Sequence, residues 1–157
     1  MNRHTKALEI LKAGTVIPAT PLVLDENRRL DEKGQRLLMN YYLDCGVGGI
    51  ATAVHTTQFE IRKPEYNLFE SILKIVSDEI DRYEKRTGKV IVKVAGVCGE
   101  TEQTVREAEL ARDCGYDAVL LSSGGLNDKS EEYMIERTRA GAEFAVRYFD
   151  VLRIVCY

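Results

Sequence analysis

Hydroxyl side chains and one histidine directly follow the apolar runs of this chain that are typical of buried strands. The clearest case is AVHTTQFE, residues 53–60, in which His55, Thr56 and Thr57 come after a run of small apolar residues. Buried strands are normally followed by turn residues, so three hydrogen-bonding side chains in a row indicate that a polar group is held there. Neutral hydroxyls and backbone N–H groups suit a small carboxylate or carbonyl compound.

Three further apolar runs end in the same way. Thr20 lies toward the end of the first run, Ser122 and Ser123 lie toward the end of the fourth, and Tyr157 closes the fifth. For any one of these hydroxyls alone, capping of the next helix or of loop backbone is a competing explanation. We therefore predict that the hydroxyls form a ring around a ligand, and the capping alternative stays open for each of them.

Apolar runs alternate with amphipathic stretches along the chain, which predicts strands separated by helices. The runs that we expect to be strands are residues 14–24, 48–54, 89–97, 116–125 and 150–157. The helices that we expect are an N-terminal one at 1–13, one capped by Asp31 and stopped by Gly46, one with Pro64 in its first turn, one capped by Thr101 and one opened by Ser130.

Strands that are apolar throughout predict a parallel α/β sheet covered by helices on both faces. Two architectures fit: a complete flavodoxin-like open sheet, with strand order 2-1-3-4-5, or part of a (β/α)8 TIM barrel. A full barrel needs about 250 residues, so this chain would supply only the first four-and-a-half β/α units. Residues 1–157 are then a single partial barrel domain, with a helix at 1–13 and strands one to five in 14–157. Both architectures place ligands at the carboxyl ends of the strands.

Composition argues against several classes of function. The chain of 157 residues has a net charge of −3 and no basic block, so we expect no nucleic-acid partner. No apolar run approaches the roughly 18 residues of a membrane span, and the N-terminus lacks the apolar core of a secretory signal. The four cysteines are far apart and there are two histidines, so we expect no metal, no cofactor and a cytoplasmic protein.

Four segments together resemble the dihydrodipicolinate synthase / N-acetylneuraminate lyase family: IPATPLVLDENRRLD, DCGVGGIATAVHTTQFE, KVIVKVAGVCGET and ELARDCGYDAVLLSS. The coinciding features are Thr-Pro after the first strand, the Thr pair after the second and Ala-Gly at the end of the third. The resemblance runs from about Gly14 to Tyr157 and matches only the front half of a family member. It implies a (β/α)8 aldolase or lyase that acts on pyruvate or another 2-oxo acid through a Schiff base.

The resemblance also implies roles for individual residues. Thr56 would join a proton relay with Tyr157 as the proton shuttle, and both are catalytic by this reading. Thr57 would bind the substrate carboxylate through its hydroxyl and backbone N–H. His55 stands where the family has a glycine, and we group it with Thr20, Ser122 and Ser123 as substrate-binding.

The family forms its Schiff base on a lysine of strand six, and no lysine follows Lys129 here. Lys93 lies inside the third expected strand, and we expect its ammonium to be at a surface or paired rather than nucleophilic. We therefore expect a truncated family protein that is inactive as given, binds a small 2-oxo acid and forms a homo-oligomer, because its edge strands lack partners. The alternatives are a non-catalytic, self-associating half-barrel or small-metabolite-binding protein, and the complete flavodoxin-like domain.

Overall fold

Four short, mostly apolar strands form one parallel sheet in the computed structural model, which describes residues 2–148 and 154–156. The strands are β1 (Gly49–Thr52), β2 (Val92–Val97), β3 (Ala118–Leu121) and β4 (Ile154–Cys156), and they pair in the order β1-β2-β3-β4. Sequential order is the order of a barrel segment, whereas an open flavodoxin-like sheet places its second strand at the edge. The flavodoxin-like alternative is therefore wrong.

The first expected strand, residues 14–24, is an extended segment beside β1 with a single isolated bridge between Ala19 and Ala51. It is attached by Gly48 N–H to the Val16 carbonyl at 3.2 Å, Ala51 N–H to the Pro18 carbonyl at 2.9 Å and Thr20 N–H to the Ala51 carbonyl at 2.9 Å. A regular ladder fails here because Pro18, which lies between the bonded residues Val16 and Thr20, has no N–H to donate. The segment still extends the sheet by one place, next to β1.

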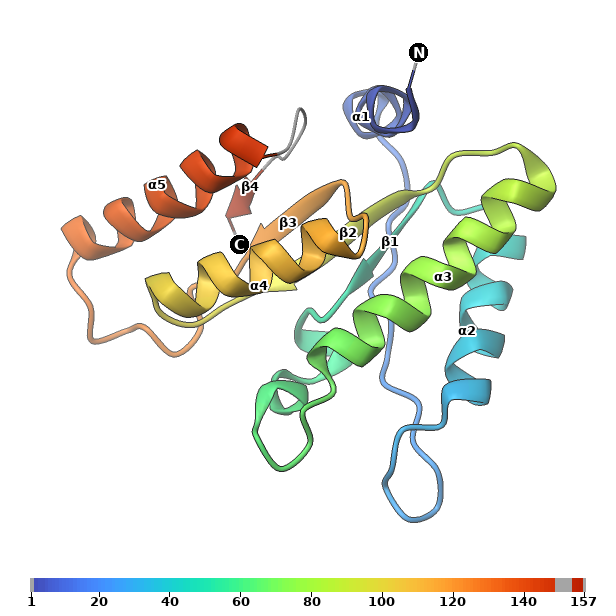
Figure 1. The fold of residues 1–157 in the computed structure, drawn as a ribbon, viewed down its shortest axis with the longest axis horizontal. Coiled ribbons are helices and arrows are strands. Elements are labelled where there is room, and N and C mark those ends of the chain that lie inside the picture. The colour runs from blue at the N-terminus through green and yellow to red at the C-terminus, as the bar shows by residue number, and fades with distance from the viewer. Residues whose placement is uncertain (1, 149–153, 157) are drawn as a thin grey trace.

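Helices follow the strands and cover one face of the sheet (Figure 1). They are α2 (Glu32–Asp44), α3 (Phe69–Thr87), α4 (Thr101–Asp113) and α5 (Glu131–Tyr148). Right-handed crossovers between strands in sequential order bring each helix to the same side, so the expected cover on both faces is wrong for the described residues. Val94 and Leu120 project to the opposite face and remain partly exposed. This is the face that lines the interior in a closed barrel.

Two buried clusters join the helices to the sheet. One packs Ile72 and Leu73 of α3 and Ala108 of α4 against Ala95 and Val119 of the sheet. The other packs Met39 and Leu43 of α2 against α3 and against Ile50 of β1. Together they fix the strand ends that carry the candidate site.

The boundaries of α2 and α5 agree with the sequence prediction. Asp31 caps α2 by accepting the Gly34 N–H at 2.9 Å, and Gly46 follows the helix with φ +81°. Ser130 accepts the Tyr133 N–H at 3.2 Å at the start of α5. Both caps satisfy backbone donors that have no partner within the helix.

Two other helix starts differ from the prediction. Pro64 lies in a turn, and α3 begins only at Phe69. The Leu68 N–H bonds back to the Ile61 carbonyl at 2.8 Å, and Asn67 has φ +46°, a conformation that cannot continue a right-handed helix. Thr101 is the first residue of α4 rather than its cap, and Glu100 holds the cap position without a side-chain bond.

Helix α1 (Arg3–Ala13) packs across the amino ends of the strands, away from the carboxyl ends. Arg3 donates to the Ile91 carbonyl just before β2 at 3.0 Å and to Asp117 just before β3 at 2.6 Å. Among the described residues, no helix combines the length and the apolar character that crossing a bilayer requires.

Candidate functional site

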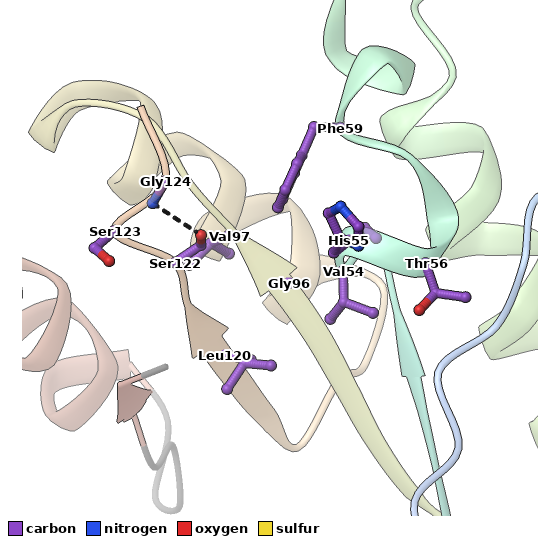
Figure 2. Close-up of a pocket in the computed structure, with 11 residues that line it drawn as sticks. Val54, His55, Thr56, Phe59, Gly96, Val97, Leu120, Ser122, Ser123 and Gly124 are labelled. Carbon is purple, nitrogen blue, oxygen red and sulfur yellow. Dashed lines mark hydrogen bonds between the residues drawn. The ribbon is translucent and has the colours of Figure 1, made fainter. Parts of the chain in front are cut away.

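A cavity of about 600 Å³ lies at the carboxyl ends of β1, β2 and β3. Figure 2 shows its wall, with His55 and Phe59 on one side, the loop after β3 on the other and Gly96 between them. The residues that line it come from three consecutive strand ends: Ala53, Val54, His55, Thr56, Phe59, Gly96, Val97, Leu120, Ser122, Ser123 and Gly124. Its position matches the place where parallel α/β folds bind ligands.

The structure brings four of the predicted site residues together at this cavity: His55, Thr56, Ser122 and Ser123. Thr20 and Thr57 are fully buried beside it and do not line it. Tyr157 lies outside the described residues, so its predicted role as proton shuttle stays a prediction. The ring of hydroxyls is thus divided between side chains at the cavity and side chains beneath it.

The turn after β1 separates the two adjacent threonines. Ala53 directly follows β1 with φ +60°, and residues 55–57 form a single 3-10 turn. The Thr57 hydroxyl accepts the Ala53 N–H at 3.1 Å and donates to the Thr20 carbonyl at 2.6 Å. Its own N–H donates to the Val54 carbonyl at 2.9 Å. Thr57 therefore ties the turn to the extended segment, while Thr56 is exposed at the cavity. The predicted carboxylate-binding role of Thr57 stays a prediction.

The His55 ring is exposed at the cavity. It contacts the Phe59 ring edge-on, with 5.6 Å between ring centroids and 64° between planes. Within the described part of the chain neither ring nitrogen makes a hydrogen bond, so both are available to a ligand.

Ser122 and Ser123 supply hydroxyls from the opposite side. The Ser122 Oγ accepts the Gly124 N–H at 3.1 Å (Figure 2), which leaves its own proton free to donate to a ligand. The Ser122 N–H bonds to the Val97 carbonyl at 3.0 Å and so fixes the loop to β2. The lining thus offers hydroxyl and imidazole groups, and no Lys, Arg, Asp or Glu side chain belongs to it among the described residues.

Two buried arginines hold the strand ends that form the cavity, and sequence reasoning missed both. Arg62 Nη2 donates to the carbonyls of Ala53 at 3.1 Å and Gly96 at 2.9 Å, and both of these residues line the cavity. Arg137 of α5 donates from Nε to the Gly99 carbonyl at 2.7 Å and from Nη2 to the Ser122 carbonyl at 2.9 Å. One arginine therefore spans β1 and β2, and the other spans the loops after β2 and β3.

Arg62 is balanced by the buried carboxylate of Glu107 on α4, with 2.9 Å between Nε and Oε1. The side chains of Arg62 and Glu107 are 10% and 5% exposed. Glu107 also accepts the Cys98 N–H at 3.1 Å and the Gln103 amide at 2.7 Å. A signal was present in the sequence, because Glu107 stands beside Ala108 and Ala111 on the apolar stripe of α4. A charge at such a position indicates a buried partner.

The close approach of β1 to β2 beneath the cavity requires a glycine at position 96. A Cβ atom added there would lie 2.5 Å from the Ala53 carbonyl oxygen, well inside van der Waals contact. The missing side chain also leaves both carbonyls within reach of Arg62. The glycine of the Ala-Gly pair in this strand is thus explained by the close approach of the Ala53 carbonyl.

Cys98 and Lys93 are the candidate nucleophiles in or next to β2, and a metal would need a group of ligating side chains. Burial, followed by the nearby charge of Glu107, raises the pKa of the Cys98 thiol, and a protonated thiol is a poor nucleophile. Lys93 is 2% exposed and faces α3, where its ammonium donates to Ser77 at 2.8 Å and pairs with Asp81. Of the two expected positions for the Lys93 ammonium, at a surface or paired, the structure shows the paired one. Residues 2–148 and 154–156 contain no group of three or more His, Cys, Asp or Glu side chains arranged to hold a metal.

Comparison with solved structures supports the barrel interpretation. A dihydrodipicolinate synthase from Bacillus anthracis superposes with a TM-score of 0.75 at 23% identity, over 92% of this chain and 45% of that one. YagE from E. coli K12, a prophage protein of the same family in complex with pyruvate, gives 0.74 at 19% identity, over 90% and 43%. The 4-hydroxy-tetrahydrodipicolinate synthase from Methylacidiphilum fumariolicum SolV gives 0.73 at 20%, over 90% and 42%.

At these identities the likeness establishes the fold, which is part of a (β/α)8 barrel like that of the dihydrodipicolinate synthase structures. The chain spans less than half the length of each of these proteins. No family model matches the sequence, and the search of curated proteins found no similar sequence. The solved structures thus confirm the partial-barrel fold that the family resemblance implies.

Proposed function

We propose that this chain forms one half of a 2-oxo-acid site of the Schiff-base aldolase type and that its cavity binds pyruvate or a related 2-oxo acid. The observation that carries the proposal is the meeting of His55, Thr56 and Ser122 at consecutive strand ends. The fold is shared with a protein that was solved with pyruvate bound. A lining without carboxylates suits an anionic ligand, because no like charge opposes it.

Each hydroxyl has a role in this proposal. Thr56 is exposed at the cavity, where its hydroxyl bonds to the charged end of the ligand. It also relays a proton to Tyr157, as the family resemblance implies. Ser122, Ser123 and His55 donate hydrogen bonds to the oxygens of the ligand. Thr57 and Thr20 support the turn that presents Thr56. The hydroxyl and N–H of Thr57 are already bonded within the protein, so Thr57 contacts a carboxylate only if the turn at residues 55–57 rearranges.

Carbon–carbon chemistry of this type needs an amine to form the Schiff base. Among the described residues no lysine lines the cavity, and Lys93 is held on the helix side of the sheet. We therefore propose that the 157-residue chain binds the 2-oxo acid without turning it over, and that lyase activity requires a lysine from outside this half of the barrel.

Calorimetric titration with pyruvate tests the binding proposal. We expect Thr56→Val to weaken binding by about tenfold, because a hydrogen bond to a charged group contributes about 1.5–3 kcal/mol. Thr15→Val is the matched control, since Thr15 is exposed and does not line the cavity, and its affinity should equal that of the wild type. Equal affinity for all three proteins would remove Thr56 from the site, and no heat of binding in the wild type would refute the proposed function.

A non-catalytic, self-associating protein is the second candidate, and the free sheet edges favour it. In the described part of the chain β4 pairs with β3 alone and the segment at 16–20 pairs with β1 alone, and Val16 is 70% exposed. Open edges are templates for pairing with another chain. We propose that the chain forms a homo-oligomer through these edges. A sedimentation profile that is monomeric at micromolar concentration would contradict this.

A further inference from the structure

The cavity is larger than the smallest 2-oxo acid needs. Its volume of about 600 Å³ falls within the range of roughly 300–1,000 Å³ that is typical of sites for drug-sized ligands. Pyruvate has a methyl group as its whole side chain and would leave most of this space empty. The side chains that line the rest of the cavity therefore indicate which further chemical group the ligand carries.

That wall is apolar and contains an aromatic ring. Val54, Phe59, Val97 and Leu120 supply side chains without polar atoms, and no charged side chain lines the cavity among the described residues. Of the charges that hold the strand ends behind this wall, Arg62 and Glu107 are paired with one another, and Arg137 donates to the carbonyls of Gly99 and Ser122. A second charged group on the ligand would lose its hydration without gaining a counter-ion on this wall, which is costly.

The Phe59 ring is held in place from two directions. His55 contacts it edge-on at 5.6 Å between centroids, and the guanidinium carbon of Arg62 lies 5.7 Å from its centroid. Figure 2 shows Phe59 and His55 facing the Ser122–Gly124 loop across the cavity. A ring fixed in advance loses little entropy when a flat ligand packs on it, and stacked or edge-on aromatic pairs add affinity beyond the area they bury.

We infer that the 2-oxo acid that this cavity selects carries an aromatic or similarly bulky apolar group on its third carbon, rather than a second carboxylate. The apolar group packs between Phe59 and Leu120, and the 2-oxo-acid end meets the hydroxyls of Thr56 and Ser122. This inference rests on the proposed function, because it specifies the ligand of the same site.

Calorimetric titrations with three 2-oxo acids test the inference. Phenylpyruvate has the expected apolar ring, 2-oxoglutarate has a second carboxylate, and pyruvate has neither. We expect phenylpyruvate to bind at least about tenfold more tightly than 2-oxoglutarate. We also expect Phe59→Ala to weaken phenylpyruvate binding about tenfold and pyruvate binding less than about twofold.

Two further variants make the result specific. Phe59→Leu keeps an apolar side chain but removes the ring, and it should retain part of the affinity for phenylpyruvate that Phe59→Ala loses. Tyr41→Ala removes an aromatic side chain that is 64% exposed on α2, and should change neither affinity. Equal binding of phenylpyruvate and 2-oxoglutarate, or an equal loss for all three acids in Phe59→Ala, would overturn the inference.

Failure of the inference can be told apart from failure of the proposed function. If pyruvate binds and phenylpyruvate binds no better, the inference fails and the proposed function stands. If phenylacetate, which lacks the 2-oxo group, binds as well as phenylpyruvate while pyruvate does not bind, the apolar wall is correct and the 2-oxo-acid function is wrong. If no 2-oxo acid binds, both fail.

Discussion

Replacing Arg62 by methionine is expected to lower the free energy of unfolding by about 3–5 kcal/mol, the usual cost of removing one partner of a buried ion pair. The replacement leaves the buried Glu107 carboxylate without its counter-ion. It also leaves the Ala53 and Gly96 carbonyls without the guanidinium that joins β1 to β2. Urea denaturation followed by circular dichroism measures the change. Methionine keeps most of the apolar length of the side chain, so little of the loss comes from packing.

Arg29→Met is the matched control for this prediction. Arg29 pairs with Asp25, but its side chain is 76% exposed, and exposed ion pairs contribute only about 0–1 kcal/mol. A loss of less than about 1 kcal/mol in Arg62→Met, or equal losses in the two variants, would mean that Arg62 does not hold the strand ends together.

Replacing Thr57 by valine is expected to cost about 2–4 kcal/mol, although the two side chains have nearly the same shape. The Thr57 hydroxyl bonds to two buried backbone groups, the Ala53 N–H and the Thr20 carbonyl. Each buried group left without a partner costs about 1–3 kcal/mol. Thermal and urea unfolding measure the change.

Thr57→Ser separates the hydroxyl from the methyl group. It keeps both hydrogen bonds and removes one methyl, which contributes about 0.8 kcal/mol, so its loss should be much smaller than that of Thr57→Val. If valine is as stable as threonine at this position, the hydroxyl does not support the turn.

Much of the fold could be predicted from local patterns. The apolar runs that became β2, β3 and β4 and the Asp31 cap of α2 depend on neighbours in sequence, which periodicity and capping rules describe well. The sequential strand order depends on pairing between distant segments. Periodicity alone left two architectures open, and the family resemblance favoured the barrel.

The errors also have physical causes. The extended segment before residue 24 has the composition of a strand, but its prolines cannot donate to a ladder. Pro64 suits the first turn of a helix, yet the bond from Leu68 to Ile61 closes a loop there before α3 begins. A propensity rule cannot see such a contact, because it depends on how the preceding turn is folded.

The candidate site was only partly accessible to sequence reasoning. The pattern placed His55, Thr56, Ser122 and Ser123 at strand ends, and these residues line the cavity. It could not show that Thr57 points away from Thr56, because the 3-10 turn sets the two directions. Arg62 and Arg137 escaped notice because arginine in a loop or on a helix usually reads as a solvated side chain. Their partners are carbonyls from distant strands, which only the fold brings near.

The most direct test of the proposed site is a titration of the isotopically labelled chain with pyruvate, followed by amide chemical shifts. We expect the largest shifts at residues 53–59 and 122–124, on the two sides of the cavity, and smaller shifts at Gly96 between them. Helix α1, at the opposite ends of the strands, should not respond. Shifts concentrated in α1 or on the outer face of α2, or no shifts at millimolar pyruvate, would contradict a 2-oxo-acid site at the carboxyl ends of the strands.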